Sequence, residues 1–166
     1  MTKICKCCGQ SRQSKYPIIC SLGDYFNPRN LRTVKKCNDI YHKANEYYRK
    51  EKYEKAIKQY EKFIDLHICD RNVFMELGSL YFKVGKLHDS IRTFKKAKGL
   101  ADRADVKLKL AEVCLTKATK TTSNKFRREC RQEAASNLSS LDHPMYEAEV
   151  RKKYNDLKII LRKVKR

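Results

Sequence analysis

A repeat of 34 residues in the middle of the chain constrains its fold more than any other feature of the sequence. When the sequence is shifted against itself by this interval, small residues fall on small ones and aromatic residues mostly fall on aromatic ones. The matching pairs are Ile40 and Phe74, Ala44 and Gly78, Tyr47 and Tyr81, Tyr48 and Phe82, Ala56 and Ser90, Ile57 and Ile91, and Tyr60 and Phe94. A period of this length is typical of stacked helical hairpins, each of which buries its apolar face against the next. The sequence therefore predicts an all-α solenoid of helical hairpins.

The second copy of the repeat carries the motif residues of a known family. These residues are Phe74, Leu77, Gly78, Tyr81, Ser90, Phe94 and Ala97. Their order resembles the tetratricopeptide repeat (TPR) family, whose first helix carries an aromatic residue, a leucine, a glycine and a tyrosine. The first copy matches less fully, with Lys43 and Phe63 at two motif positions, and Ile68 and Asp102 replace the closing prolines. The resemblance implies a helical-repeat scaffold that binds protein partners and is not an enzyme.

The organisation of the whole chain follows from this repeat. We expect TPR-like units at residues 37–70, 71–104 and 105–141, the last of them degenerate, with a loop over residues 119–124. Residues 142–166 should form a basic capping helix whose apolar seam contains Val150, Tyr154, Leu157, Leu161 and Val164. Residues 1–36 are left as a basic, cysteine-rich arm.

The resemblance also implies a concave groove lined by the first helix of each hairpin. The groove residues that it implies are Tyr41, Asn45, Tyr48, Met75, Ser79 and Phe82. Aromatic and methionine side chains are enriched where proteins bind one another, so the resemblance predicts a protein partner in this groove. The alternative is that the chain's own N-terminal segment fills it, because monomers seldom expose apolar grooves.

The cysteines cluster near the N-terminus. Cys5, Cys8 and the following Gly9 have the form of a zinc knuckle, and Cys20 and Cys37 could complete a four-thiolate Zn²⁺ site. Cys7 and His42 are alternative ligands. The segment also resembles half of a treble-clef zinc module, because a second C-x2-C pair is absent. The alternative is that these are ordinary reduced thiols.

The formal net charge of +20 is concentrated at the two ends of the chain. Residues 1–36 and 150–166 together supply 14 of the excess positive charges. The polyanion contacts that we predict are Arg151, Lys152, Lys153, Lys158, Arg162, Lys163, Lys165 and Arg166. These charges favour a nucleic-acid-containing assembly, and the alternative function is an RNA- or DNA-binding protein that contacts phosphates with its zinc arm and tail.

The sequence gives no sign of catalysis or of membrane insertion. It has neither a nucleotide-binding glycine loop nor a G-x-S-x-G motif, so we predict a protein that is not an enzyme. It lacks a long apolar stretch and an apolar N-terminal signal. We therefore expect an intracellular protein, cytoplasmic or nuclear, with no membrane partner.

Overall fold

The computed structural model describes residues 31–66, 70–141 and 147–164, and these residues form helices joined by short turns. No strand occurs among them, and none of their helices is long and apolar enough to cross a membrane. The helices are α2 (Leu31–Arg49), α3 (Tyr53–Asp65), α4 (Arg71–Lys83), α5 (Leu87–Leu100), α6 (Ala104–Lys120), α7 (Asn124–Ser139) and α8 (Ala148–Lys163).

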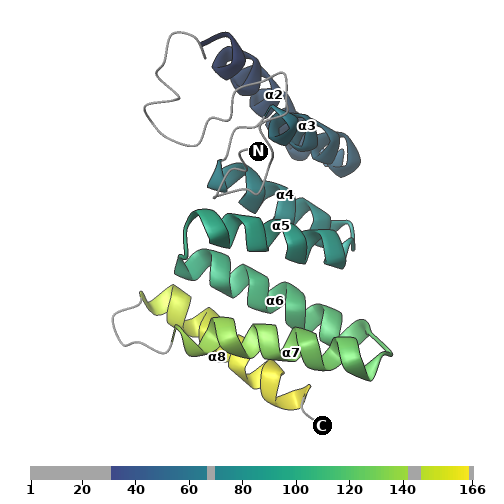
Figure 1. Ribbon diagram of the computed structural model, residues 1–166, viewed down its shortest axis with the longest axis vertical. Helices are drawn as coiled ribbons and strands as arrows, with labels where there is room; N and C mark the ends of the chain where they lie inside the picture. Colours follow the sequence, from purple (N-terminus) through teal and green to yellow (C-terminus); the bar gives the residue numbers. More distant parts are fainter. Residues whose placement is uncertain (1–30, 67–69, 142–146, 165–166) are drawn as a thin grey trace, which may run out of the picture.

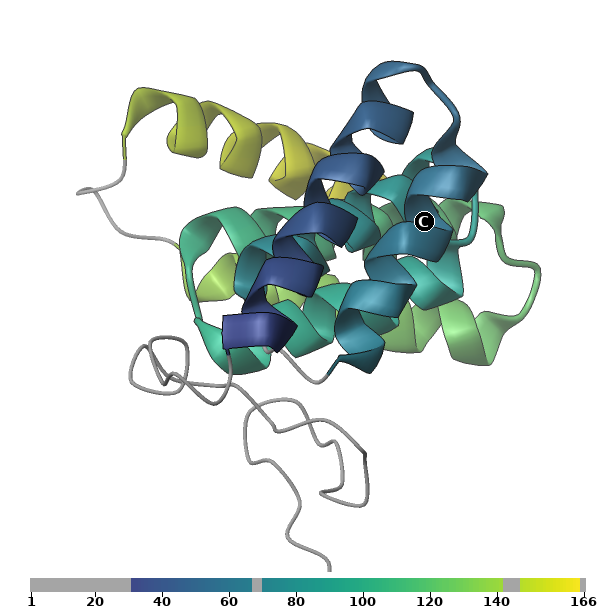
Figure 2. The ribbon, with the colours of Figure 1, turned by 90° about the horizontal axis from the view of Figure 1, so that it is seen from above.

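Three helical hairpins stack along the long axis of the molecule. They are α2 with α3, α4 with α5, and α6 with α7, and successive hairpins meet where α3 packs on α4 and α5 on α6 (Figure 1). Helix α8 follows at the end of the stack and packs against α6 and α7. Seen from above, the N-terminal half of α8 extends beyond the outline of the other helices (Figure 2). The expected all-α, TPR-like helical-repeat fold is thus confirmed.

Two predicted boundaries differ from the structure. Helix α2 begins at Leu31, so the expected boundary between residues 36 and 37 falls inside a helix. Helix α6 continues to Lys120 and α7 begins at Asn124, so the predicted loop over residues 119–124 is wrong in length. The threonines of this segment have low helix propensity, but Ala118 and the last turn of α6 are held by tertiary packing.

The turns inside the first two hairpins repeat the same backbone geometry. Gly85 between α4 and α5 has a φ of 79°, and Lys86 donates its backbone N–H to the carbonyl of Tyr81. Glu51 lies 34 residues earlier with a φ of 55°, and Lys52 donates in the same way to Tyr47. The turn requires a residue in the left-handed region of backbone conformation at this position, and of these two hairpins only the second has glycine there.

Replacing Glu51 with glycine should therefore stabilise the first hairpin. A side chain in the left-handed region costs about 1 kcal/mol relative to glycine, and the greater freedom of glycine in the unfolded chain offsets part of this. We expect the free energy of unfolding to rise by about 0.5 kcal/mol, measured by urea denaturation. Exposed Glu54→Gly in α3 is the control, and it should destabilise because its position is helical. Destabilisation by both substitutions would contradict the assigned turn.

The close contact between α4 and α5 depends on small residues. The ring of Phe94 lies directly over Gly78, where an added Cβ atom would come within 2.8 Å of the ring. Ser90 is fully buried and donates its hydroxyl to the carbonyl oxygen of Gly78, 2.7 Å away. Packing thus explains why the repeat has small residues at the positions of Gly78 and Ser90: larger side chains would keep α4 and α5 apart.

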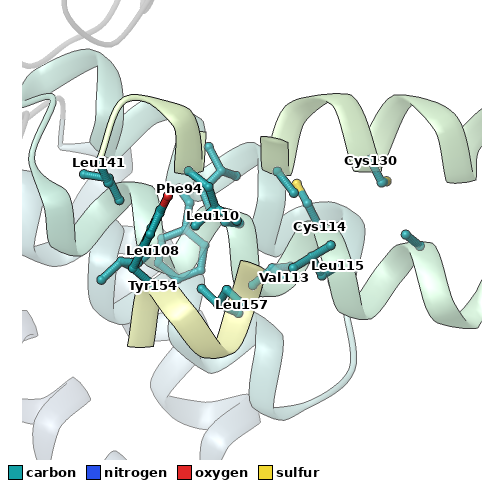
Figure 3. Close-up of a cluster of buried hydrophobic side chains, with 14 residues drawn as sticks. Phe94, Leu108, Leu110, Val113, Cys114, Leu115, Cys130, Leu141, Tyr154 and Leu157 are labelled. Atoms are coloured by element: carbon teal, nitrogen blue, oxygen red, sulfur yellow. The ribbon is translucent and has the colours of Figure 1, made fainter. Parts of the chain in front are cut away.

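Phe94 also connects the second hairpin to the rest of the core. It belongs to a buried cluster with Leu108, Leu110 and Leu115 of α6 and with Tyr154 and Leu157 of α8 (Figure 3). Helix α8 contributes these two residues from its buried face, and the predicted apolar seam of the last helix is confirmed at both positions. The docking of α8 on this cluster positions the site described next.

Candidate functional site

A groove of about 710 Å³ runs between α6 and α8, and we name it the α6–α8 groove. Helix α6 lines one side and α8 the other. The lining residues are Glu112, Leu115, Thr116 and Thr119 of α6, and Glu149, Lys152, Lys153, Asp156, Leu157 and Ile160 of α8. A groove of this volume is within the range of sites that bind ligands or peptide side chains.

The floor of the α6–α8 groove is apolar and rigid. Leu115 and Leu157 line it while their side chains are nearly fully buried in the cluster of Figure 3. Ile160 lies one helical turn beyond Leu157, and 41% of it is exposed. Because the neighbouring Leu157 is anchored in the core, Ile160 presents an apolar surface at a fixed position.

The walls of the groove carry charges of both signs. The Nζ atom of Lys153 lies 2.8 Å from an Oε2 atom of Glu112, which connects α8 to α6 across the groove. Lys109 lies 3.6 Å from the same carboxylate oxygen. Glu149 and Asp156 add two more carboxylates and Lys152 one more ammonium group. The lining residues therefore have no positive excess, in contrast to the chain as a whole.

The predicted groove residues of α2 are half-buried and held by α3. The ring of Tyr41 packs edge-to-face against Tyr60, with ring centroids 6.0 Å apart. Asn45 accepts a hydrogen bond of 2.7 Å from the Tyr60 hydroxyl. The Tyr48 ring packs near Tyr53, and Lys83 of α4 lies 4.8 Å from its centroid. These contacts fix the side chains in place, and their role in binding stays a prediction.

The predicted groove residues of α4 are also half-buried. Met75 and Phe82 pack against the cluster that contains Phe94 and Leu108, so part of each side chain belongs to the core. Ser79 lies between them in sequence and is partly exposed. These residues could line a binding surface only with the faces that the core leaves uncovered.

Helix α6 continues the same helix face, and its Glu112 and Leu115 are not among the groove residues predicted from the sequence. Glu112 and Leu115 follow Ser79 and Phe82 by 33 residues, one fewer than the period of the first two copies. A search at both spacings could have found them, because Ala111 then falls opposite Gly78 and Leu110 opposite Leu77. The face that contains the predicted residues of α2 and α4 thus leads to the α6–α8 groove.

The basic residues predicted to bind polyanions have different environments. Lys153 is engaged with Glu112, and Lys158 donates a hydrogen bond to the Tyr154 hydroxyl. Arg151, Lys152, Arg162 and Lys163 are exposed on α8. Lys165 and Arg166 lie outside the described residues. The described part of the tail thus uses some of its charge within the fold.

The residues proposed for zinc are only partly described. Cys5, Cys7, Cys8 and Cys20 lie outside the described residues. Cys37 is fully buried in the core beside Val34, and burial raises the pKa of its thiol to about 12. Its role as a zinc ligand stays a prediction, because the other cysteines proposed for the site lie outside the described residues. His42 is exposed on α2, and no group of three possible ligands occurs within the described ranges.

The comparison with solved structures supports the fold. The chain is similar to the type III secretion chaperone SycD of Yersinia enterocolitica, solved in complex with a peptide of the translocator YopD, with 19% identity and a TM-score of 0.59. That alignment covers 79% of this chain and 93% of the chaperone. A type III secretion complex from Aeromonas hydrophila aligns with 17% identity and a TM-score of 0.58, over 87% of this chain and 91% of the other.

A third similar structure is that of yeast Tom70, with 24% identity and a TM-score of 0.57. The alignment covers 79% of this chain and a quarter of Tom70 (25%). No curated protein matches the chain in sequence.

The family comparison locates one repeat directly. Residues 40–66 match the tetratricopeptide repeat family, and they lie in the copy whose motif is less complete. The match covers α3 and the C-terminal half of α2, and the core residues Ala44, Ala56 and Tyr60 of these helices are fully buried. The resemblance inferred from the sequence is therefore confirmed: residues 40–66 match the tetratricopeptide repeat family, and the described chain has a TPR-like helical-repeat fold.

Proposed function

We propose that this protein is a non-enzymatic adaptor that binds a peptide segment of a partner protein in the α6–α8 groove. The observation that carries the proposal is the pairing of a rigid apolar floor with walls of mixed charge. The floor offers Leu115, Leu157 and Ile160 to an apolar side chain of the peptide. Such anchors in preformed pockets dominate the affinity of most protein interfaces.

The charges along the walls favour a peptide over a nucleic acid at this site. Three carboxylates and two ammonium groups line the groove, so a phosphate backbone would meet repulsion from Glu112, Glu149 and Asp156. A peptide presents N–H donors and C=O acceptors at regular intervals, and both kinds find complementary side chains here. The site is therefore suited to an extended or helical segment with at least one large apolar residue.

The similar structures support the same mode of contact. SycD was solved with a peptide of its translocator, so a protein of this fold can hold a peptide. We further propose that the half-buried face of Tyr48, Met75 and Phe82 extends the binding surface along the stack toward α2. Helix α8 then serves as the closing helix that completes the groove at the other end.

The exposed isoleucines of α8 provide a matched test. Ile160 lines the groove, whereas its neighbour Ile159 is 50% exposed and is not among the lining residues. Peptides would first be selected on the wild-type protein from a displayed random library, and their Kd measured by fluorescence anisotropy. We expect Ile160→Asp to weaken binding at least about tenfold, because it replaces an apolar anchor contact with a carboxylate.

Ile159→Asp is the control, because it makes the same chemical change at an exposed site outside the groove. It should leave the Kd within about twofold, since surface substitutions away from a contact have small effects. Circular dichroism should show the same helix content for both variants. Equal loss of affinity in the two variants, or in neither, would show that the selected peptides bind elsewhere.

Contact with nucleic acid remains a second proposal. The observation that favours it is the basic excess at the chain ends, to which the exposed Arg162 and Lys163 of α8 belong. In this reading a zinc-stiffened arm and the tail would bind phosphates within a larger assembly, and affinity should fall steeply with salt. Affinity for a short RNA that does not change with salt would rule out this role.

A further inference from the structure

A second hollow, of about 320 Å³, lies between α7 and α8, and we name it the α7–α8 pocket. Arg128, Arg131, Gln132 and Ala135 of α7 line it together with Leu161 of α8. The four residues of α7 follow the spacing of one helix face, so their side chains project toward the same side. The pocket shares no lining residue with the α6–α8 groove.

Arg131 is the unusual residue of this pocket. Its Nε atom is buried from solvent and has no hydrogen-bond partner within the described part of the chain. A buried donor without a partner costs about 1–3 kcal/mol, and most buried donors in proteins avoid this cost. The neighbouring Arg127 shows the usual arrangement, because its guanidinium donates to the Thr121 carbonyl and to the Asn124 side chain. The free Nε of Arg131 therefore indicates a missing acceptor.

The acidic residues near the pocket do not supply this acceptor. On α7, Glu133 is engaged with Lys95 of α5 at 2.8 Å and also accepts from Asn137. Glu129 is exposed and does not line the pocket. On α8, Asp156 lines the α6–α8 groove, and Arg162 follows Leu161 in sequence. The described lining residues of the pocket thus include two guanidinium groups and no carboxylate.

We infer that the α7–α8 pocket binds the phosphate group of a phosphate monoester. Two guanidinium groups and the Gln132 carboxamide offer several N–H donors, which match the three terminal oxygens of such a group. Two positive charges balance the dianion that a monoester forms above its second pKa of about 6. Ala135 and Leu161 provide apolar walls beside the guanidinium groups.

A phosphodiester fits the same pocket less well. A diester carries one negative charge, so it gains less from the second guanidinium. It also continues on both sides of the phosphorus, whereas a hollow of about 320 Å³ suits a terminal group. The ligand class is therefore a terminal phosphate, either free inorganic phosphate or the phosphorylated side chain of a protein.

The resonance of the Arg131 Nε–H group provides a direct test. The ¹⁵N-labelled full chain would be titrated with inorganic phosphate, with a phosphoserine peptide and with dimethyl phosphate at pH 7.5. We expect inorganic phosphate and the phosphoserine peptide, whose phosphate groups can carry two negative charges, to shift the Arg131 Nε–H resonance. Dimethyl phosphate, which carries one charge, should shift it much less. A larger response to the peptide than to phosphate would identify a phosphorylated protein as the source, and the reverse would identify the free anion.

Matched variants separate the pocket from general charge effects. Arg131→Gln should weaken phosphate binding at least about tenfold, because a bidentate charged hydrogen bond is lost. Arg131→Lys keeps the positive charge but cannot donate two parallel hydrogen bonds to a phosphate, so its affinity should be only slightly higher than that of Arg131→Gln. Lys125→Gln removes one charge from an exposed position of the same helix and should leave the affinity within about twofold.

The pH dependence gives an independent readout. The affinity for the phosphoserine peptide should rise several-fold from pH 5 to pH 7.5, because the ligand gains its second negative charge over this range. Equal losses in Arg131→Gln and Lys125→Gln would overturn the proposal in favour of non-specific attraction. Equal responses to dimethyl phosphate and to the phosphoserine peptide would overturn it in favour of a nucleic-acid backbone.

Discussion

Replacing Phe94 with alanine is expected to lower the free energy of unfolding by about 3–5 kcal/mol. The ring is fully buried and lies in the cluster that connects the second hairpin to α6 and α8. Its removal loses the transfer free energy of a large aromatic side chain and leaves a cavity between α4 and α5. Urea denaturation followed by circular dichroism measures the loss. A change below about 1 kcal/mol would contradict the assigned packing.

The contact of this ring with Gly78 can be isolated by a double-mutant cycle. Gly78→Ala alone should cost about 1–3 kcal/mol, because the new Cβ atom would lie 2.8 Å from the Phe94 ring. In the Phe94→Ala background the same methyl group enters vacated space, so the substitution should be neutral or stabilising there. Additive effects of the two substitutions would show that these residues are not in contact.

Alkaline pH is expected to destabilise the protein, because its buried thiols release their protons more readily in the unfolded chain. Burial raises the pKa of the Cys37 and Cys114 thiols to about 12, compared with 9.0 in the absence of the fold. The folded chain holds these protons while the unfolded chain releases them, so stability is full below pH 9 and falls as the pH rises toward 12. Each thiol should cost roughly 1 kcal/mol between pH 9 and 10.

Three other groups act in the same direction. Burial raises the pKa of the Tyr60 and Tyr81 hydroxyls above the usual value, and it also raises that of the Cys130 thiol. Urea denaturation at pH 8, 9 and 10 measures the summed effect. Cys114→Ala should reduce the pH dependence by about 1 kcal/mol over the last interval, although it lowers stability at every pH. A free energy of unfolding that stays constant from pH 8 to 10 would contradict the burial of these groups.

The sequence predicted the first two hairpins because small and aromatic residues recur where the packing of each hairpin requires them. Gly78 and Ser90 must be small so that Phe94 can approach, and the same residue classes appear in the first copy at Ala44, Ala56 and Tyr60. The third hairpin was predicted less well, because it follows the second at an interval of 33 residues instead of 34. At this interval Lys107 takes the motif position of Phe74. There the packing of α6 against α5 and α7, which is not local, determines where the helix ends.

The candidate sites were harder to predict because both depend on the position of α8. The buried residues Tyr154 and Leu157 predict that this helix packs against the stack. They do not predict the orientation of α8 relative to α6, which places Ile160 at the groove. Arg128 and Arg131 were overlooked for another reason: the segment that contains them is nearly neutral as a whole. Only the structure separates Arg127, whose guanidinium has partners, from Arg131, whose Nε has no hydrogen-bond partner among the described residues.

The most direct measurement of the central claim is photo-crosslinking from the α6–α8 groove to a peptide selected on the wild-type protein. Benzoylphenylalanine would replace Ile160 in one variant and Ile159 in the other, and mass spectrometry would locate the adducts. A peptide held between α6 and α8 predicts strong crosslinking from position 160, competed by unlabelled peptide, and little from position 159. Equal crosslinking from both positions, or none from position 160 in a variant that still binds the peptide, would contradict the claim.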